Sequence, residues 1–324
     1  EEVVSHVRAG RFELMGGGLG EPILTMLTDG DAVGQVRAFS QHLRRRHGIA
    51  VRGAWLTERI WEAHLASVLA DAGIEYTVVD DFHFLVSGLR SPQLTGSFLT
   101  EDKGRKLRLF AGSEFLRYSI PFRDPEDTIE HLRGYATDDG ENVIVYADDG
   151  EKFGLWPETH KHVYTKGWLR RFLELLDRNK DWIRFTTFSE AVDQLPPVGK
   201  VYLADASYRE MTEWALPVPA QVELAGVMKD LKDAHLAERA RPFIRGGSWR
   251  SFKTKYVEAA QMYARMMEVS GLVADRAAAK NAEEARMALY HAQCNCAYWH
   301  GVFGGLYMPF LRVALYRELL RAEN

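Results

Sequence analysis

Tyr146-Ala-Asp-Asp-Gly-Glu-Lys-Phe-Gly-Leu-Trp-Pro157 is the stretch of this chain that indicates its fold most directly. It follows Glu141-Asn-Val-Ile-Val145, a short apolar run that is typical of a buried strand. Two acids therefore come just after the carboxyl end of a predicted strand, with an aromatic residue close behind them. In α/β enzymes such strand ends carry the active site, and paired carboxylates beside aromatic rings act on sugars. Folding alone gives little reason for these acids, because unpaired carboxylates at a strand end lose hydration.

Strand-like and helix-like segments alternate on both sides of this stretch, over residues 1–218. Short apolar runs indicate strands, and segments with a 3.6-residue apolar period indicate helices. The expected strands are 12–15, 51–56, 75–79, 106–110, 117–122, 143–146, 183–188 and 200–203. The expected helices are 31–46, 59–72, 124–135, 168–179 and 189–195. Repeated units of this length predict an α/β fold with a parallel sheet, most simply a TIM-like barrel.

The pattern changes at about residue 219. Beyond it, segments rich in Ala, Leu, Met and Glu show a helical period. These segments are 221–239, 256–270, 276–292 and 307–323. Because no Pro- or Ser-rich linker separates the two parts, we expect the helices to pack on the barrel. The sequence thus predicts a barrel over 1–218 and an all-helical domain over 219–324.

Bulk composition limits the possible partners. The 324 residues carry a net charge of −4, which argues against nucleic acid as the main partner. No apolar run approaches the roughly 18 residues that would indicate a membrane span. The two cysteines, Cys294 and Cys296, are one residue apart, so we expect a reducing compartment, the cytoplasm. The first residue is Glu1 and not Met, so we expect an upstream segment; the oligomeric state stays open.

Glu58 is the first candidate for catalysis. It lies in Trp55-Leu-Thr-Glu-Arg-Ile-Trp-Glu62, which comes directly off a predicted strand. Arg59 is its neighbour and is expected to lower the pKa of the Glu58 carboxyl by its charge. An ionised carboxylate at this place suits a nucleophile, and the flanking Trp rings suit a sugar. The alternative is an acid that interacts with a helix N-terminus.

Asp149 is the second candidate, as a general acid/base. Asp148 is nearer the predicted strand and is expected to support it, while Glu151 is placed to bind substrate hydroxyl groups. The alternative for each of the three is a solvated loop acid. Glu13 precedes the Gly16-Gly-Gly-Leu-Gly20 turn, and we expect it to reach the same site. That turn lacks the Lys-Ser/Thr of a phosphate-binding loop.

Two pairs of potential metal ligands, His160-Lys-His162 and Cys294-Asn-Cys296, lack a third ligand at a useful spacing, so we expect no metal. Gly301-Val-Phe-Gly-Gly305 follows Trp299 and interrupts a helical region. Its glycines indicate either close approach of the backbone to a ligand or plain packing between helix and barrel.

Together, these segments resemble glycoside hydrolase family 57, in its branch of 4-α-glucanotransferases and α-amylases. The resemblance extends from about residue 10 to residue 312. It is carried by Phe12-Glu-Leu-Met-Gly-Gly-Gly-Leu-Gly-Glu-Pro-Ile-Leu24, Trp55-Leu-Thr-Glu-Arg-Ile-Trp-Glu62, Asp148-Asp-Gly-Glu-Lys-Phe-Gly-Leu-Trp-Pro157, Ser207-Tyr-Arg-Glu-Met-Thr-Glu-Trp214, Gly246-Gly-Ser-Trp249 and Ala297-Tyr-Trp-His-Gly-Val-Phe-Gly-Gly305. Branching enzymes of the family differ in the third of these segments, which argues against that activity.

The resemblance implies an incomplete (β/α)7 barrel followed by a helical domain. It implies retaining cleavage of an α-1,4-glucan or maltooligosaccharide, with Glu58 as nucleophile and Asp149 as acid/base. Retention requires carboxyl groups roughly 5–5.5 Å apart. The resemblance places the substrate against three tryptophans and two further acids, and no metal or organic cofactor is expected. These residues are Trp55, Trp156 and Trp299 as sugar platforms and Glu13 and Glu151 as hydroxyl partners.

Three departures from the family pattern motivate an alternative. The first signature region, with its pocket histidine, and the C-terminal β-sandwich domain are expected to be missing. Cys296 stands where relatives of this branch carry an Asp near the substrate. A catalytically impaired or non-catalytic glucan-binding relative is therefore the alternative function. A metal-dependent deacetylase is a third possibility, disfavoured by the lack of a His/Asp ligand set. The sequence does not decide between hydrolysis and transfer.

Overall fold

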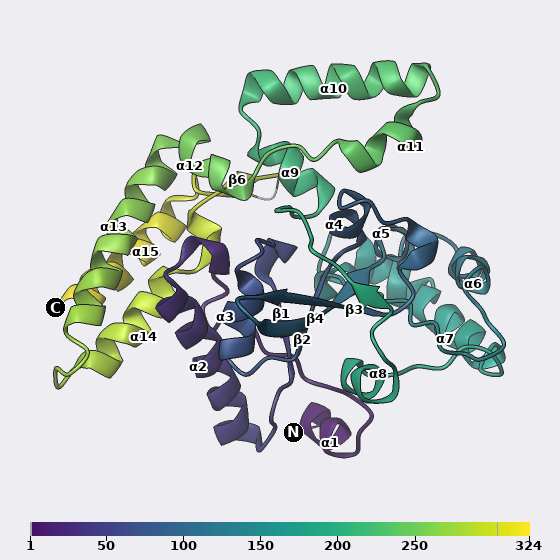
Figure 1. Cartoon of the computed structure of the whole chain (residues 1–324), viewed down its shortest axis with the longest axis horizontal. Helices are drawn as coiled ribbons and strands as arrows, with labels where there is room; N and C mark the ends of the chain where they lie inside the picture. The colour runs from purple at the N-terminus through teal and green to yellow at the C-terminus, as the bar shows by residue number, and fades with distance from the viewer. Residues whose placement is uncertain (1, 303) are drawn as a thin grey trace.

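The centre of the molecule is a five-stranded sheet with the order β1-β2-β4-β3-β5 (Figure 1). The structure is a computed structural model, which describes residues 2–302 and 304–324. The strands are β1 (Gly53–Trp55), β2 (Tyr76–Asp80), β3 (Ser97–Asp102), β4 (Arg105–Gly112) and β5 (Gly199–Lys200). β1, β2 and β4 are mutually parallel, whereas β3 returns antiparallel to β4 and pairs in parallel with β5. The expectation of an α/β fold rich in parallel pairs is confirmed.

Single parallel bridges extend this ladder beyond its regular strands. Gly16 pairs with Ala54 of β1, and Val145 pairs with Gly112 at the end of β4. The segment around Gly16, which precedes α2, and the segment that leads into the Asp148–Asp149 stretch therefore both run alongside the sheet. Glycine at position 53 is required by packing, because a Cβ there would lie 2.0 Å from the Tyr76 ring.

Helices surround the sheet and, with the loops and short 3₁₀ turns that join them, form the rest of the described chain. Those of the first two thirds are α1 (Glu2–Arg8), α2 (Asp29–His47), α3 (Leu65–Asp71), α4 (Asp81–Leu85), α5 (Glu114–Ser119), α6 (Pro125–Arg133), α7 (Trp168–Arg178), α8 (Phe188–Gln194) and α9 (Arg209–Ala215). Those of the last third are α10 (Val218–Asp233), α11 (Ala237–Ala240), α12 (Phe252–Lys255), α13 (Val257–Asp275), α14 (Ala282–Ala292) and α15 (Pro309–Glu323), with a hairpin of β6 (His300–Gly301) and β7 (Gly304–Gly305). Among the described residues, none of these helices has the length and apolarity that a bilayer span needs.

The two faces of the sheet bury different clusters, as the alternation of side chains along a strand requires. Tyr76, Val78 and Phe110 pack with Val145 in one cluster. The other cluster joins the sheet to α2 and α3; it includes Val36, Leu65, Leu69, Val79, Leu107 and Leu109. The sheet is thus buried on both sides, which leaves its strand ends as the places where polar groups gather.

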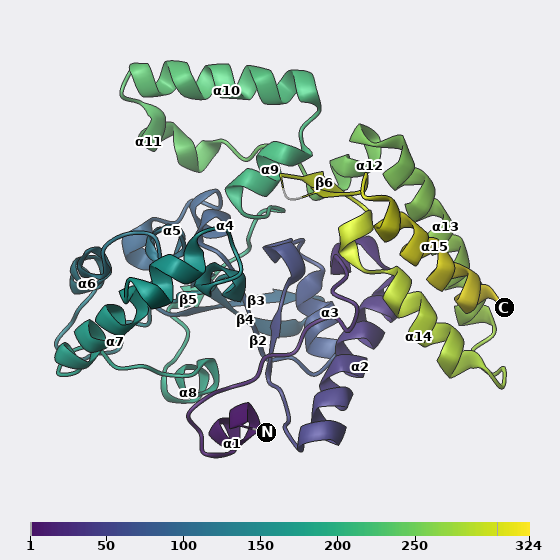
Figure 2. The ribbon, with the colours of Figure 1, turned by 180° about the vertical axis from the view of Figure 1, so that it is seen from behind.

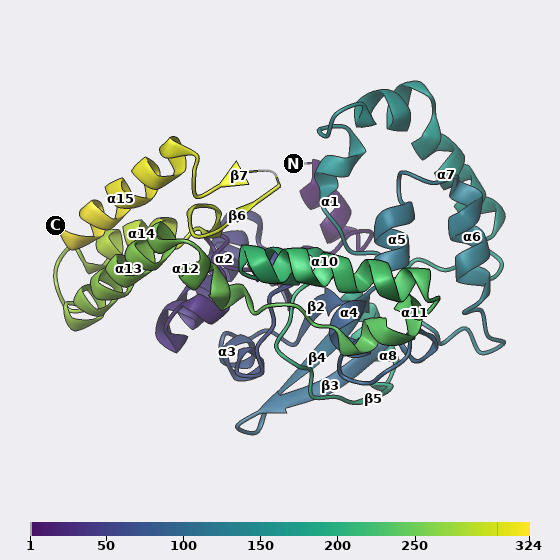
Figure 3. The ribbon, with the colours of Figure 1, turned by 90° about the horizontal axis from the view of Figure 1, so that it is seen from above.

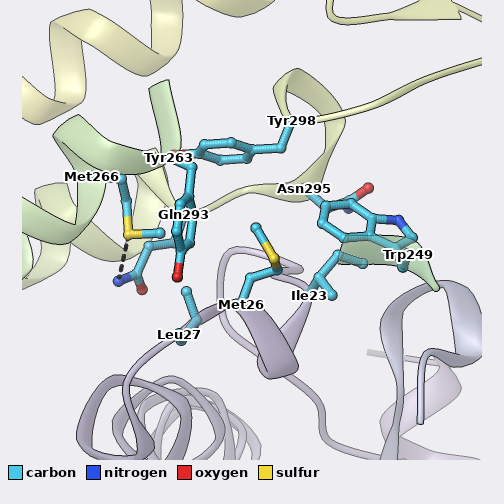
Figure 4. A pocket seen from close by; sticks show the side chains of 9 residues that line it. All are labelled: Ile23, Met26, Leu27, Trp249, Tyr263, Met266, Gln293, Asn295 and Tyr298. Atoms are coloured by element: carbon cyan, nitrogen blue, oxygen red, sulfur yellow. Dashed lines mark hydrogen bonds between the residues drawn. The ribbon is translucent and has the colours of Figure 1, made fainter. Parts of the chain in front are cut away.

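The helices α12 to α15 pack against the barrel, as expected. Figures 1 and 2 show them beyond α2, on one side of the sheet. One apolar cluster joins Ile23 and Tyr208 of the barrel part to Met262, Leu289 and Leu315 of these helices. A small cavity lies in this contact (Figure 4). Its lining residues are Ile23, Met26, Leu27, Trp249, Tyr263, Met266, Gln293, Asn295 and Tyr298, so it lies apart from the acids discussed below.

α10 and α11 are arranged differently from the other helices of the last third. They form a pair that lies at one end of the molecule in Figure 1 and crosses the front of the view from above in Figure 3. α10 contains no buried residue. The chain leaves α9 and returns beside it, where the Gly247 N–H donates to the carbonyl of Thr212 at 2.8 Å. Residues 217–246 are therefore an excursion from the packed fold.

Several local expectations were wrong. Residues 12–15 and 143–146, expected as strands, form no regular strand, and only the single bridges of Gly16 and Val145 lie there or next to them. Residues 117–122, expected as a strand, include the end of α5, which begins after Ser113 accepts a hydrogen bond from the Leu116 N–H. Residues 183–188 are extended only in part and join no ladder, and β3 was not expected. The expected helix 59–72 is a 3₁₀ turn at Thr57–Arg59 followed by the shorter α3.

Candidate active site

Glu58 lies on a strained turn at the carboxyl end of β1. Its backbone has φ 54° and ψ 16°, and Arg59 has φ 49°, so two successive residues with side chains adopt left-handed conformations. Each such residue costs about 1–3 kcal/mol unless its surroundings hold it. Here the Ser207 hydroxyl donates to the carbonyl of Glu58 at 2.6 Å, and the Trp61 N–H donates to the carbonyl of Ala206 at 2.9 Å. The segment before α9 thus holds the Glu58 turn in place.

The Glu58 carboxylate is largely buried and accepts one hydrogen bond from a tyrosine. The Tyr208 hydroxyl donates to Glu58 Oε2 at 2.7 Å. Burial raises the pKa of Glu58, while the Tyr208 hydrogen bond and the charges of Arg59 and Arg117 lower it and the charge of Asp149 raises it. The expected effect of Arg59 on this pKa has the right sign, but desolvation outweighs it, so the net direction is upward.

Two guanidinium groups lie over the ring of Tyr208. The Cζ atoms of Arg59 and Arg117 are 4.5 Å and 4.7 Å from the ring centroid. Both groups also contact Asp80 Oδ2 at the end of β2, at 3.6 Å and 3.5 Å. Cation–π and ionic contacts therefore orient the Tyr208 ring from which the hydrogen bond to Glu58 comes.

Asp148 is a buried support and not a free acid. Its side chain is 0% exposed and forms an ion pair with Lys152, while Arg117 Nε lies 3.4 Å from Asp148 Oδ1. The same oxygen accepts the backbone N–H of Asp149 at 2.9 Å. Burial raises the pKa of Asp148, and Lys152 opposes this rise. Asp148 thereby fixes the backbone that carries Asp149.

Asp149 itself is exposed, at the start of the 3₁₀ turn Gly150–Phe153. Its charge acts on Glu58, so the structure brings the two predicted catalytic carboxyl groups into one electrostatic environment. One acid is buried and held, and the other faces solvent. This asymmetry suits a nucleophile paired with an acid/base that must exchange protons.

The three predicted tryptophans are each half-buried and each held by a defined contact. Trp55 lies under the guanidinium group of Arg59, at 5.5 Å from its ring centroid. Trp156 stacks on Phe122 with an interplanar angle of 17°. Trp299 stacks on Trp214 with an angle of 18°. Fixed rings of this kind suit sugar stacking, and their role as platforms stays a prediction.

Cys296 and Glu151 also lie on the site side of the molecule. Cys296 is exposed, and Cys294, Glu21 and Glu58 all act to raise the pKa of its thiol, so its environment includes the Glu58 carboxylate. Glu151 is exposed, two residues after Asp149. Both stay predictions as substrate contacts.

Glu13 lies near the opposite, amino-terminal end of the sheet, where the fold binds its carboxylate, and its role as a substrate contact stays a prediction. Its carboxylate accepts hydrogen bonds from the Tyr76 hydroxyl, at the start of β2, and from the Ser189 hydroxyl and backbone N–H. A cavity beside it is lined by Ile49 and Ala50, which precede β1. From Glu13 the chain runs towards the Gly16–Ala54 bridge, in the same direction as β1. It therefore approaches the carboxyl ends of the strands only after Glu13.

Sequence reasoning missed the residues that hold the two acids. These are Asp80, Arg117, Lys152 and Tyr208. A signal existed for Tyr208, which lies in one of the segments that carry the family resemblance, and for Lys152, which lies in another.

Among the described residues, no group of three or more His, Cys, Asp or Glu side chains is arranged to hold a metal ion.

The parallel sheet, the helical module packed on it and two acid-bearing turns at the carboxyl ends of the strands define the class of barrel-type glycoside hydrolases. A family model described as glycosyl hydrolase family 57 matches residues 2–204. A second, described as the middle domain of α-amylase/4-α-glucanotransferase, matches residues 247–324. The chain belongs to glycosyl hydrolase family 57. Membership in this family also removes the reason to pursue a deacetylase.

Individual relatives agree with this assignment. The chain is 42% identical to α-amylase 1 of Dictyoglomus thermophilum, over 97% of this chain and 46% of that protein. It is 42% identical to a 4-α-glucanotransferase of Thermococcus litoralis, over 99% of this chain and 47% of that protein. The crystal structure of the T. litoralis 4-α-glucanotransferase superposes with a TM-score of 0.93 at 41% identity, covering 99% of this chain and 49% of that one. The expected incomplete (β/α)7 barrel with its helical module is thereby confirmed, and the chain spans about half the length of the curated relatives it matches.

Proposed function

We propose that this chain forms the catalytic part of a retaining enzyme that cleaves or transfers α-1,4-glucosidic linkages in α-glucans or maltooligosaccharides. The observation that supports this most is the Glu58 turn: a strained, largely buried carboxylate with a tyrosine donor, under the charge of the exposed Asp149. Strain of this kind at the end of a strand gathers at functional sites. The names of the relatives, α-amylase and 4-α-glucanotransferase, support the substrate class.

In the proposed first step, a Glu58 oxygen attacks the anomeric carbon while Asp149 gives a proton to the departing glycosidic oxygen. The bond from the anomeric carbon to that oxygen breaks, and a glycosyl ester on Glu58 forms. Tyr208 holds the nucleophile in place from one side. Asp148 keeps Asp149 aligned through its backbone N–H.

In the second step, Asp149 takes a proton from water or from a glucan hydroxyl group, and that oxygen displaces Glu58. Water gives hydrolysis, and a glucan gives transfer. Both outcomes share the same two carboxylates, which agrees with the two kinds of name among the relatives. The two carboxyl groups complete this cycle, so we propose no metal or organic cofactor.

Further residues complete the proposal. Trp55, Trp156 and Trp299 offer ring faces to glucose units, and Glu151 and Cys296 lie where substrate hydroxyl groups are expected. We assign residues 1–218 to the barrel and 219–324 to the helical domain. Because both cysteines are free thiols, we also propose that the protein works in the reducing cytoplasm, which cell fractionation would test.

Incubation of the full-length protein with maltoheptaose tests the function. New chain lengths without a rise in reducing ends indicate transfer, and a rise in reducing ends indicates hydrolysis. No change in either, or full activity in the Glu58→Gln variant, would exclude the proposal.

The alternative is a glucan-binding relative with impaired catalysis, and Cys296 is the observation that favours it. A thiol cannot accept hydrogen bonds from two hydroxyl groups as a carboxylate does. Calorimetry with maltoheptaose separates the two functions, because binding without any turnover would support the alternative. Restored turnover in a Cys296→Asp variant of an inactive protein would point to this position as the cause.

A further inference from the structure

Arg117 lies between the groups that support the two predicted catalytic acids. It belongs to α5, and its side chain is 12% exposed. Its Cζ atom is 4.7 Å from the centroid of the Tyr208 ring, and its Nε is 3.4 Å from Asp148 Oδ1. Its Nη1 is 3.5 Å from Asp80 Oδ2. One guanidinium group thus touches an aromatic ring and two buried carboxylates.

Two of these neighbours lead directly to the predicted catalytic carboxyl groups. The Tyr208 hydroxyl donates to Glu58 Oε2 at 2.7 Å. Asp148 Oδ1, the atom that faces Arg117 Nε, accepts the backbone N–H of Asp149 at 2.9 Å. Arg117 is therefore one contact away from the support of each acid.

The position of Arg117 is itself fixed by its surroundings. Lys152 Nζ donates to the carbonyl of Arg117 at 2.6 Å and pairs with Asp148, so backbone and side chain of Arg117 are tied to the same acid. Glu210 Oε2 lies 3.9 Å from its Nη1. Fixed charges of this kind act strongly because Arg117, Asp80 and Asp148 are largely shielded from water.

Arg59 is the residue with which Arg117 must be compared. It also lies over the Tyr208 ring and contacts Asp80, but it is part of the strained Glu58 turn, so its removal would alter that turn directly. Arg117 comes from a separate helix and links the Tyr208 side of the site to the Asp148 side. Arg117 is therefore the better residue with which to test whether one side chain supports both acids.

We propose that Arg117 is a positioning residue that aligns both carboxyl groups for the double displacement, Glu58 through Tyr208 and Asp149 through Asp148. This inference rests on the proposed function. Arg117 acts through other residues and does not need to touch the substrate. Its loss should therefore reduce kcat much more than it changes KM, and it should alter the pH dependence of the reaction.

The direction of the pH effect follows from charge. The positive charge of Arg117 favours the ionised form of Glu58, and the nucleophile must be ionised to attack. Without this charge, Glu58 holds its proton to a higher pH. The acidic limb of the profile of kcat/KM against pH should then move upward, by about half a pH unit or more.

The experiment measures kcat, KM and the pH profile of the full-length protein on maltoheptaose for the wild type and for Arg117→Met, Arg117→Lys and Arg209→Met. We expect Arg117→Met to lower kcat by about 10²-fold and to move the acidic limb upward. Arg117→Lys should return the limb towards that of the wild type, because it restores the charge. Arg209 pairs with Glu114 at 2.7 Å on the same side of the molecule, so Arg209→Met is the matched control and should leave the limb in place.

The possible results separate this inference from the function on which it rests. No turnover by the wild type would overturn the proposed function and this inference with it. If the wild type is active and its acidic limb coincides with that of Arg117→Met, the inference alone is overturned. A shift of the limb in Arg209→Met as large as that in Arg117→Met would overturn it as well. If Arg117→Met does not fold, Arg117→Lys combined with Tyr208→Phe carries the test. The fold loss of kcat/KM in the double variant should be smaller than the product of the losses in the two single variants. A loss equal to that product would contradict the proposal.

Discussion

Glu13 and Glu58 are glutamates at opposite ends of the same sheet, and each accepts a hydrogen bond from a tyrosine. Tyr76 donates to Glu13 near the start of β2, and Tyr208 donates to Glu58 beyond the end of β1. Glu13 is further bonded to the hydroxyl and the backbone of Ser189, so its oxygens are occupied by the fold. Glu58 instead lies on a left-handed turn, and its pKa is raised by burial and, to a smaller degree, by the charge of Asp149.

The comparison teaches that hydrogen bonding does not by itself separate a structural acid from a catalytic one. The two glutamates differ in the free-energy cost of holding each carboxylate in place. The contacts of Glu13 join its segment to β2 and α8, whereas Glu58 combines backbone strain, burial of its charge and a neighbouring acid. We therefore expect Glu13 to contribute to stability and Glu58 to contribute to activity.

Replacement of the two glutamates by glutamine tests this contrast with the largest expected effect. Glu58→Gln should lower kcat/KM on maltoheptaose by at least about 10⁴-fold, because an amide cannot form the glycosyl ester. Glu13→Gln should stay within about threefold of the wild type at a temperature where it is folded. Steady-state kinetics with both variants measure the difference. Equal losses in the two variants would remove the functional distinction between the two ends of the sheet.

Asp149 should show a loss that depends on the leaving group. Asp149→Asn should reduce turnover of maltoheptaose by about 10²- to 10⁴-fold. An α-maltosyl fluoride needs little protonation of its leaving group, so its first step should lose far less. Pre-steady-state release of fluoride measures that step. A variant that loses both substrates to the same degree would show that Asp149 has a role other than proton donor.

Tyr208→Phe should produce a smaller, pH-dependent effect on the Glu58 side. The Tyr208 hydrogen bond favours ionised Glu58, so its loss raises the pKa of that carboxyl further. Activity requires the ionised nucleophile, and the acidic limb of kcat/KM should therefore move to higher pH, with about a tenfold loss at neutral pH. Tyr76→Phe at the Glu13 end is the matched control and should leave the limb where it is. An unchanged limb in Tyr208→Phe would show that this hydroxyl does not control the ionisation of Glu58.

Replacement of Glu13 and of Glu58 by glutamine should change the stability of the protein in opposite directions. Glu13→Gln leaves the Ser189 N–H or hydroxyl without an anionic acceptor and should lower the free energy of unfolding by about 1–3 kcal/mol. Burial raises the pKa of Glu58, so the folded state binds this proton more tightly than the unfolded state does, and stability falls as pH rises through the folded pKa. At neutral pH, Glu58→Gln removes that cost and should stabilise the protein by about 0.5–2 kcal/mol. Thermal or urea unfolding at pH 7 measures both, and a loss of stability in Glu58→Gln would contradict this view of the turn.

Local patterns were sufficient to predict the acids of the Glu58 and Asp149 segments. Each acid follows an apolar run within a few residues, so one short stretch of chain contains both the strand and the group that the strand end presents. The division between a parallel sheet and a packed helical module was also readable, because the apolar period changes near residue 219. Both features are set by residues that are close together in the sequence, and the apolar period is a pattern of such residues.

What was missed depends on contacts between distant residues. Tyr208 meets Glu58 across 150 residues, and Arg117 joins Asp80 and Asp148 on other elements. Residues 117–122 combine Tyr, Ile and Phe, which favour strands, but the cap at Ser113 and the packing of α5 keep residues 117–119 in a helix, and a turn follows. The contacts of Glu13 with Tyr76 and Ser189 were also not predictable, because its position along the chain does not say which end of the sheet its side chain will face.

The central claim is that Glu58 forms the covalent glycosyl-enzyme. The most direct test is to treat the full-length protein with a 5-fluoro glycosyl fluoride of the α-glucan series, which slows release of the intermediate, and to locate the added sugar by peptide mass spectrometry. We predict one glycosyl group per chain, esterified to Glu58 and absent from the Glu58→Gln variant. A sugar attached to Asp149, Glu13 or any other residue, or turnover with inversion at the anomeric carbon, would contradict the account.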